Sequence, residues 1–107
     1  MELKQYQIIL VNLNPTHGTE MNKTRPCVIV SPDEMNKYLK TIVIVPITSQ
    51  MKSYPTRVLI SNNDIVGNMA IDQIRTIDKS RVIKILGNLS QQEQLNVKRI
   101  IKETFVD

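Results

Sequence analysis

The middle of the chain holds a strand-length aliphatic run, and residues 41–50 read TIVIVPITSQ. Residues 41–47 predict a buried β-strand, because a short β-branched run of this kind fits a strand with little exposed surface. Pro46 lies near the end of the run, where its missing amide donor is tolerated. The hydroxyls of Thr48 and Ser49 come directly after it. We therefore expect polar groups at the mouth of a buried strand.

Further strands are predicted on both sides of this run. Each is an apolar, β-rich segment bounded by Gly, Pro, Asn or Ser. These segments cover residues 6–13, 26–30, 56–60 and 81–86, and residues 69–77 predict a long extended segment. Residues 61–64 and Gly67 indicate turns between strands.

Two helices are predicted as well. Ser31, Pro32 and Glu34 fit the start of a short helix, with Ser31 as the cap and Glu34 returning a bond to it. Residues 90–93, SQQE, form a second capping box before the closing helix. In that helix the apolar residues recur at helical spacing, at Val97, Ile100, Ile101 and Phe105. No repeat or linker is evident, so residues 1–107 are expected to form a single domain. The fold class is mainly β, a small half-open β-barrel with short helices.

Composition narrows the class of protein. A chain of 107 residues with 41% hydrophobic and 22% charged residues is expected to build one core and not to be disordered. The single Cys27 and single His17 leave no disulfide and no zinc cluster, and we predict no metal and no cofactor. No apolar run reaches the length of a signal core or membrane span, so a cytoplasmic location and no membrane contact are expected. The net charge of +4 favours an acidic or polyanionic partner.

Arg25 is the most suggestive chemical group, because it stands directly before a predicted strand that would hold its guanidinium in place. Its fork of donors matches a phosphate. The alternative is a surface ion pair with Glu20 or another carboxylate. The Thr48 hydroxyl can likewise donate to a phosphoryl oxygen, or it can bond its own backbone in a turn.

The remaining polar residues carry weaker signals. Successive strand residues point to opposite faces, so Asp72 and Gln73 are not expected to reach one site together. His17 is a minor candidate for a general base, and Cys27 is expected in the core. From the residues alone, the chain is a small basic β-domain with phosphate-capable groups at strand ends.

Several segments, taken together, resemble the MazF/PemK (Kid-like) family of toxins from toxin–antitoxin systems. Order and spacing are kept over nearly the whole chain, including the closing helix. The segments that carry the resemblance are 9–16 ILVNLNPT, 18–20 GTE, 25–26 RP, 28–32 VIVSP, 45–50 VPITSQ, 52–55 KSYP and 72–77 DQIRTI.

The resemblance implies an SH3-like barrel with a C-terminal helix, a homodimer and a metal-independent endoribonuclease. Such an enzyme cuts single-stranded mRNA at short motifs and so inhibits translation and growth. Cleavage proceeds by attack of the ribose 2′-hydroxyl, leaving a 2′,3′-cyclic phosphate and a 5′-hydroxyl. The catalytic Arg and Thr of the family pattern fall on Arg25 and Thr48, and some relatives have a further catalytic Arg where this chain has Ala70.

The same resemblance predicts the residues around the reaction. Which group moves the protons stays open: Arg25 is a plausible acid but a reluctant base, and Glu20, His17 or a water can share the task. Two loops, residues 14–24 and 52–56, are expected to flank the RNA groove. The expected RNA-binding residues are Thr16, Gly18, Thr19, Lys23, Thr24, Ser49, Gln50, Lys52, Tyr54, Arg57 and Gln73.

The family also implies a cognate antitoxin whose acidic, disordered segment covers this groove. Two other functions fit the same barrel. One is a CcdB-type toxin that binds and poisons DNA gyrase without cutting RNA. The other is a non-catalytic SH3-like module that binds an extended acidic peptide.

Overall fold

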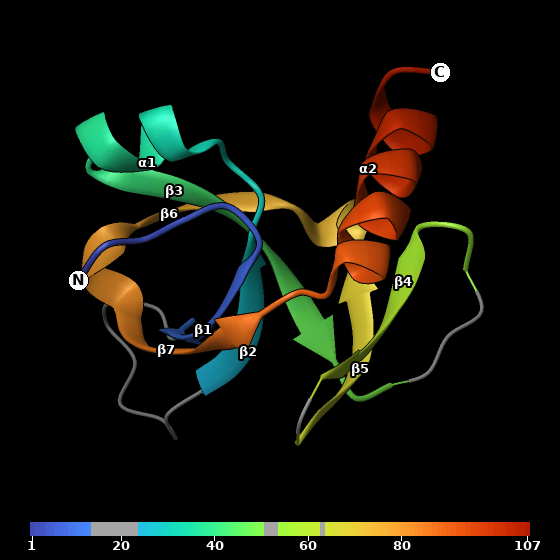
Figure 1. Ribbon diagram of the computed structural model, residues 1–107, viewed down its shortest axis with the longest axis horizontal. Helices are drawn as coiled ribbons and strands as arrows, with labels where there is room; N and C mark the ends of the chain where they lie inside the picture. Colours follow the sequence, from blue (N-terminus) through green and yellow to red (C-terminus); the bar gives the residue numbers. More distant parts are fainter. Residues whose placement is uncertain (14–23, 51–53, 63) are drawn as a thin grey trace.

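The computed structural model describes residues 1–13, 24–50, 54–62 and 64–107 (Figure 1). The described elements follow one another in a mainly β order that ends in a helix. They are β1 (Gln7–Asn12), β2 (Thr24–Ile29), α1 (Asp33–Tyr38), β3 (Thr41–Thr48), β4 (Arg57–Asn62), β5 (Ile65–Ala70), η1 (Ile71–Gln73), β6 (Arg75–Asp78), η2 (Lys79–Arg81), β7 (Val82–Asn88) and α2 (Gln91–Phe105).

Strand β3 connects the two halves of an antiparallel, curled sheet. The strand order is β4-β5-β3-β2-β1-β7, and β6 also pairs with β3. β3 pairs with β2 up to Pro46 and then with β5 through Ile47 and Thr48. Pro46 therefore lies where β3 leaves one neighbour for another, a place where its missing amide donor costs little. This arrangement confirms the predicted fold class, a mainly β half-barrel with a C-terminal helix.

Two apolar clusters of the described residues explain the continuous aliphatic runs. One cluster lies between β3, the β4–β5 hairpin and α2 and includes Val45, Ile47 and Val97. The other lies on the opposite face of β1, β2 and β3 and includes Cys27 and Ile44. Each fully buried aliphatic side chain contributes about 1.5–3 kcal/mol. Cys27 is completely buried, which confirms its prediction as a core residue.

Helix α2 begins at the predicted capping box and stands over the β4–β5 hairpin (Figure 1). The Ser90 hydroxyl accepts from the Glu93 amide, and the Glu93 carboxylate accepts from the Ser90 amide. Glu93 also accepts from the Ser61 amide of β4 at 3.0 Å, so it joins the helix to the sheet. Phe105 is 54% exposed, contrary to the expected apolar stripe, because it is the last residue of a helix whose end leaves the sheet.

Other local predictions were wrong. Ser31 does not cap α1, whose cap is Pro32 without a side-chain hydrogen bond, and Glu34 returns no bond to it. Ser31 is instead buried, where its hydroxyl donates to Asn36 Oδ1 and accepts from the Val43 amide. Gly67 lies inside β5 and not in a turn.

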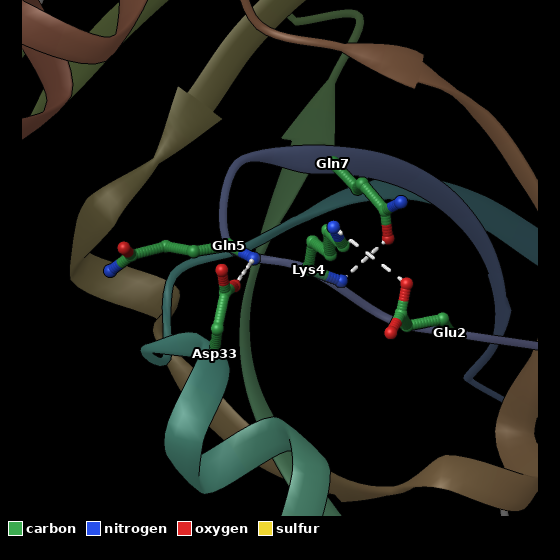
Figure 2. A network of polar contacts seen from close by, with 5 residues as sticks. All are labelled: Glu2, Lys4, Gln5, Gln7 and Asp33. Atoms are coloured by element: carbon green, nitrogen blue, oxygen red, sulfur yellow. Dashed lines mark hydrogen bonds and ion pairs between the residues drawn. The ribbon is translucent and has the colours of Figure 1, made fainter.

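The N-terminal segment is held against α1 by polar contacts (Figure 2). The Gln5 amide donates to Asp33 Oδ1 at 2.7 Å, and the Lys4 amide donates to Gln7 Oε1 at 2.8 Å. The Lys4 ammonium lies 3.7 Å from a Glu2 carboxylate oxygen. These contacts set the approach to β1.

In the part of the chain that the structure describes, neither helix is long and apolar enough to cross a membrane.

Lowering the pH is expected to destabilise the fold through Glu93. Burial alone would raise the pKa of this carboxyl, but hydrogen bonds from Ser90, Ser61 and Asn62 outweigh it and hold the pKa below 4.5. Because the folded pKa is depressed, the carboxylate stabilises the fold above pH 4.5, and that stability is lost as the pH falls below it. Urea unfolding of Glu93→Gln between pH 7 and pH 3 should show a flatter pH dependence than the parent chain. A control variant at exposed Glu103, Glu103→Gln, should keep the parental slope, and an unchanged slope for Glu93→Gln would contradict this assignment.

Candidate active site at the ends of strands β2 and β3

Strand β2 places Arg25 at the open end of the sheet. Arg25 is the second residue of β2 and pairs with the fully buried Val11 of β1, so it lies within the strand and not before it. Its side chain is exposed, and it makes no ion pair with any residue that the structure describes. Glu20, its alternative partner, lies outside the described residues.

Arg25 and Thr48 face the same side of the sheet at the same end. β2 and β3 run antiparallel with Cys27 paired to Pro46, so the start of β2 meets the end of β3. Side chains alternate along a strand, which puts Arg25 with Cys27 and Thr48 with Pro46 on one face. Val45 and Ile47 belong to the cluster on the opposite face, as this alternation requires. The strand register thus puts the two candidates on one face, at the ends of β2 and β3 that meet.

The Thr48 hydroxyl takes part in a turn and remains able to donate. Its Oγ1 accepts a hydrogen bond from the Gln50 amide at 3.1 Å. This is the backbone-bonded turn that the sequence left open as an alternative. Because Oγ1 is the acceptor in this bond, the hydroxyl proton is still available to a substrate oxygen.

Arg75 is a second guanidinium on the same face, and the sequence interpretation missed it. It pairs with Ile44 across β6 and β3, and its side chain is exposed. Burial raises the pKa of the Cys27 thiol to about 12, while the charges of Arg25 and Arg75 both act to lower it. Both arginines therefore lie near one buried thiol. The sequence signal for Arg75 was its place in the segment 72–77. Only the pairing of β6 with β3 shows that Arg75 lies on the same face as Arg25.

A hollow of about 300 Å³ opens beside Arg25, between the start of β2, the end of β3 and the turn that begins β5. Thr24 and Ser49, both expected to bind RNA, line it together with Arg25. Asp64 adds a carboxylate that the sequence did not single out. Ile47 and Ile65 supply apolar lining. A hollow of this kind offers hydroxyls, a cation and apolar surface to a bound nucleotide.

Arg57 lies in a second cluster, beside Asp72 and Tyr54. Its Nε is 3.2 Å from Asp72 Oδ1, and its guanidinium lies 5.2 Å from the centre of the Tyr54 ring. The Arg57 side chain is only 9% exposed, and its buried Nε has no well-directed hydrogen bond, so the contact with Asp72 is one of charge. The Thr56 hydroxyl donates to Asp72 and is the main reason that the pKa of this carboxyl lies below its ordinary value. Arg57, which is among the expected RNA-binding residues, thus lies against Tyr54 and Asp72.

Asp72 and Gln73 lie in the short turn η1, contrary to the predicted extended segment 69–77. The Ile74 amide donates to the Ile71 carbonyl and closes this turn. Strand alternation therefore does not separate the two side chains, and both are exposed. Arg57 of β4 pairs with Ala70 of β5, two residues before Asp72. The Arg57 guanidinium therefore lies beside Asp72, although it comes from the neighbouring strand.

The other expected site residues divide into two groups. Gln50, which follows the end of β3, and Tyr54, which precedes the start of β4, are both exposed. The remaining expected residues lie outside the part of the chain that the structure describes. They are Thr16, His17, Gly18, Thr19, Glu20, Lys23 and Lys52.

Comparison with known proteins identifies relatives over nearly the whole chain. A family model described as a PemK-like, MazF-like toxin of type II toxin–antitoxin systems matches residues 4–105. Endoribonuclease MazF of Staphylococcus saprophyticus subsp. saprophyticus is 31% identical over 105 residues, which cover 92% of this chain and 88% of that protein. Endoribonuclease MazF of Staphylococcus epidermidis is 32% identical over 101 residues, covering 89% and 84%.

Solved structures share the fold. A MazE–MazF crystal structure from Deinococcus radiodurans superposes with a TM-score of 0.84 at 22% identity, covering 97% of this chain and 96% of that one. An endoribonuclease in complex with its cognate antitoxin, from a mycobacterial species, has a TM-score of 0.81 at 20% identity, covering 94% and 92%.

Proposed function

The chain belongs to the PemK-like, MazF-like family of type II toxin–antitoxin toxins and is an endoribonuclease, and we propose that it cuts single-stranded mRNA through the ribose 2′-hydroxyl. The observation that carries this mechanism is the shared face of Arg25 and Thr48 at the meeting ends of β2 and β3. The matched relatives are endoribonucleases, which favours this activity over gyrase poisoning.

In the proposed reaction the substrate supplies the nucleophile. The 2′-oxygen forms a bond to the neighbouring phosphorus, and the bond from phosphorus to the 5′-oxygen breaks. The 2′-hydroxyl gives up its proton as this bond forms, and the leaving 5′-oxygen takes one up, so that the products are a 2′,3′-cyclic phosphate and a 5′-hydroxyl. The protein has to hold the strand in line for this attack and to compensate the charge that develops on the phosphorane.

Arg25 and Thr48 divide that work. The Arg25 guanidinium balances the charge on the non-bridging oxygens, and its fork of donors fixes their position. The Thr48 hydroxyl donates to one of these oxygens, with its own Oγ1 held by the Gln50 amide. Arg75, on the same face, binds a neighbouring phosphate of the strand.

Bases of the strand are bound beside this centre. Tyr54 is 53% exposed, and Arg57 lies over its ring, so the ring offers a fixed surface for one base. Such a stack contributes about 1–3 kcal/mol. Thr24 and Ser49 donate and accept within the hollow beside Arg25. These contacts orient the strand and contribute to the choice of sequence.

We further propose that the toxin acts as a homodimer in the cytoplasm and is silenced by a cognate antitoxin. An acidic, disordered antitoxin segment suits a chain of net charge +4 with exposed arginines on its active face. A complex with MazE is what the similar Deinococcus radiodurans structure contains. Covering the face of Arg25 would block the RNA and the reaction together.

Digestion of a defined RNA by the purified protein tests this function. We expect fragments whose 5′ ends accept phosphate from polynucleotide kinase without prior phosphatase treatment. RNA cleavage itself should proceed at the same rate with and without EDTA. Fragments with 5′-phosphates, or loss of cleavage in EDTA, would contradict the mechanism. Intact RNA together with inhibition of DNA supercoiling by gyrase would favour the CcdB-type alternative.

A further inference from the structure

Strand β5 approaches the backbone of Thr48 unusually closely at Gly67. Thr48 pairs with Asn68 and Ile47 with Met69, at the end of the β3–β5 ladder. A Cβ atom added to Gly67 would lie 2.5 Å from the Thr48 carbonyl oxygen and 2.9 Å from Ile47 Cγ2. The first of these atoms belongs to the backbone and has no rotamer by which to move away. Any side chain at position 67 would therefore displace Thr48.

Asn68 is a buried polar residue in an apolar stretch. It is 5% exposed, and Gly67, Met69 and Ala70 beside it are all buried. Its Nδ2 donates to the Gln50 carbonyl at 3.4 Å. A buried amide without a partner destabilises the fold, so an amide at this position requires such an acceptor. Asn68 thus ties the residues that follow β3 to the middle of β5.

These contacts form one continuous path to the Thr48 hydroxyl. Asn68 holds the Gln50 carbonyl, and the Gln50 amide donates to Thr48 Oγ1 at 3.1 Å. Gly67, which has no Cβ, leaves free the space in which the Thr48 carbonyl lies. The backbone and the hydroxyl of Thr48 are therefore both set by two consecutive residues of β5.

We infer that Gly67 and Asn68 are positioning residues that aim the Thr48 hydroxyl at the scissile phosphate. The inference rests on the proposed role of Thr48 in the reaction. Neither residue touches the substrate; each acts through Thr48. A donor that is held in advance stabilises the transition state without reorganising, whereas a misplacement of about 1 Å can cost a hundredfold in rate.

The test is a double-mutant cycle on RNA cleavage. Asn68→Ala is expected to lower kcat by about tenfold to a hundredfold with little change in KM, because binding by Arg25 and Arg75 is untouched. Combining Asn68→Ala with Thr48→Ala should give the rate of Thr48→Ala alone, since the same hydroxyl is lost in both. In the Asn68→Ala protein, exchange of the Gln50 amide hydrogen should be faster, a readout that does not depend on activity.

Two glycine variants form a matched pair. Gly67→Ala should lower kcat as Asn68→Ala does, because the new methyl group displaces the Thr48 carbonyl. Gly87→Ala should keep the parental rate, since a Cβ there would meet only Asn62 Oδ1 at 3.9 Å. Melting temperatures of all variants report on folding, and if Gly67→Ala does not fold, the Asn68→Ala cycle decides.

The outcomes separate this inference from the proposed function. If Thr48→Ala cleaves slowly while Asn68→Ala cleaves at the parental rate, the inference is overturned and the proposed function stands. If the two losses multiply in the double variant, Asn68 acts by another route and the inference is again overturned. If Thr48→Ala itself cleaves at full rate, the proposed role of Thr48 fails, and the inference fails with it.

Discussion

Replacing Arg25 with alanine should slow RNA cleavage by about a hundredfold or more at saturating substrate. Arg25 lines the hollow, and its guanidinium can balance the negative charge that the proposed phosphorane gains as it forms. Because Arg25 is exposed and pairs with no described carboxylate, its loss should leave the melting temperature nearly unchanged. Single-turnover cleavage of a labelled oligonucleotide, together with thermal unfolding, measures both quantities.

Arg75→Ala is the matched comparison, since it removes the same charge from the same face. We expect it to weaken binding and to leave the rate at saturation close to the parental value. The slope of log affinity against log salt should become less steep by about 0.7, the contribution of one phosphate on a single strand. Arg25→Ala cleaving at full rate, or Arg75→Ala losing as much rate as Arg25→Ala, would refute the division of roles between them.

The sequence predicted those parts of the fold that depend on local pattern. The run at residues 41–47 became β3, and the SQQE box at residues 90–93 caps α2, because both are determined by neighbours within a few positions. Ser31 misled the interpretation, because its hydroxyl is used by Asn36 and by the distant Val43 amide. The turn at η1 was likewise hidden, since residues 69–77 read as a single β-rich stretch.

The site was predictable only where residues are close in sequence or part of a recognised segment. Arg25 and Thr48 were named in this way, and the register of β2 with β3 puts them on one face. Arg75 and Asn68 depend on the pairing of β3 with β6 and with β5, which local sequence does not encode. The contact of Arg57 with Asp72 was missed for the same reason, because Asp72 approaches from another element.

A substrate with deoxyribose in place of ribose immediately 5′ of the scissile phosphate should not be cut at all. The single missing oxygen is the proposed nucleophile, and no described residue of the protein is assigned that task. Binding should change little, because the contacts proposed for Arg25, Arg75 and Tyr54 are to phosphates and a base and not to the 2′-oxygen. Competition against an all-ribose oligonucleotide measures the affinity, and a gel of the labelled strand measures cleavage. Moving the deoxyribose by one nucleotide in the 3′ direction provides the control and should restore cleavage. Efficient cutting of the first analogue would mean that water is the nucleophile. The roles proposed for Arg25 and Thr48 in attack by the 2′-hydroxyl would then be wrong.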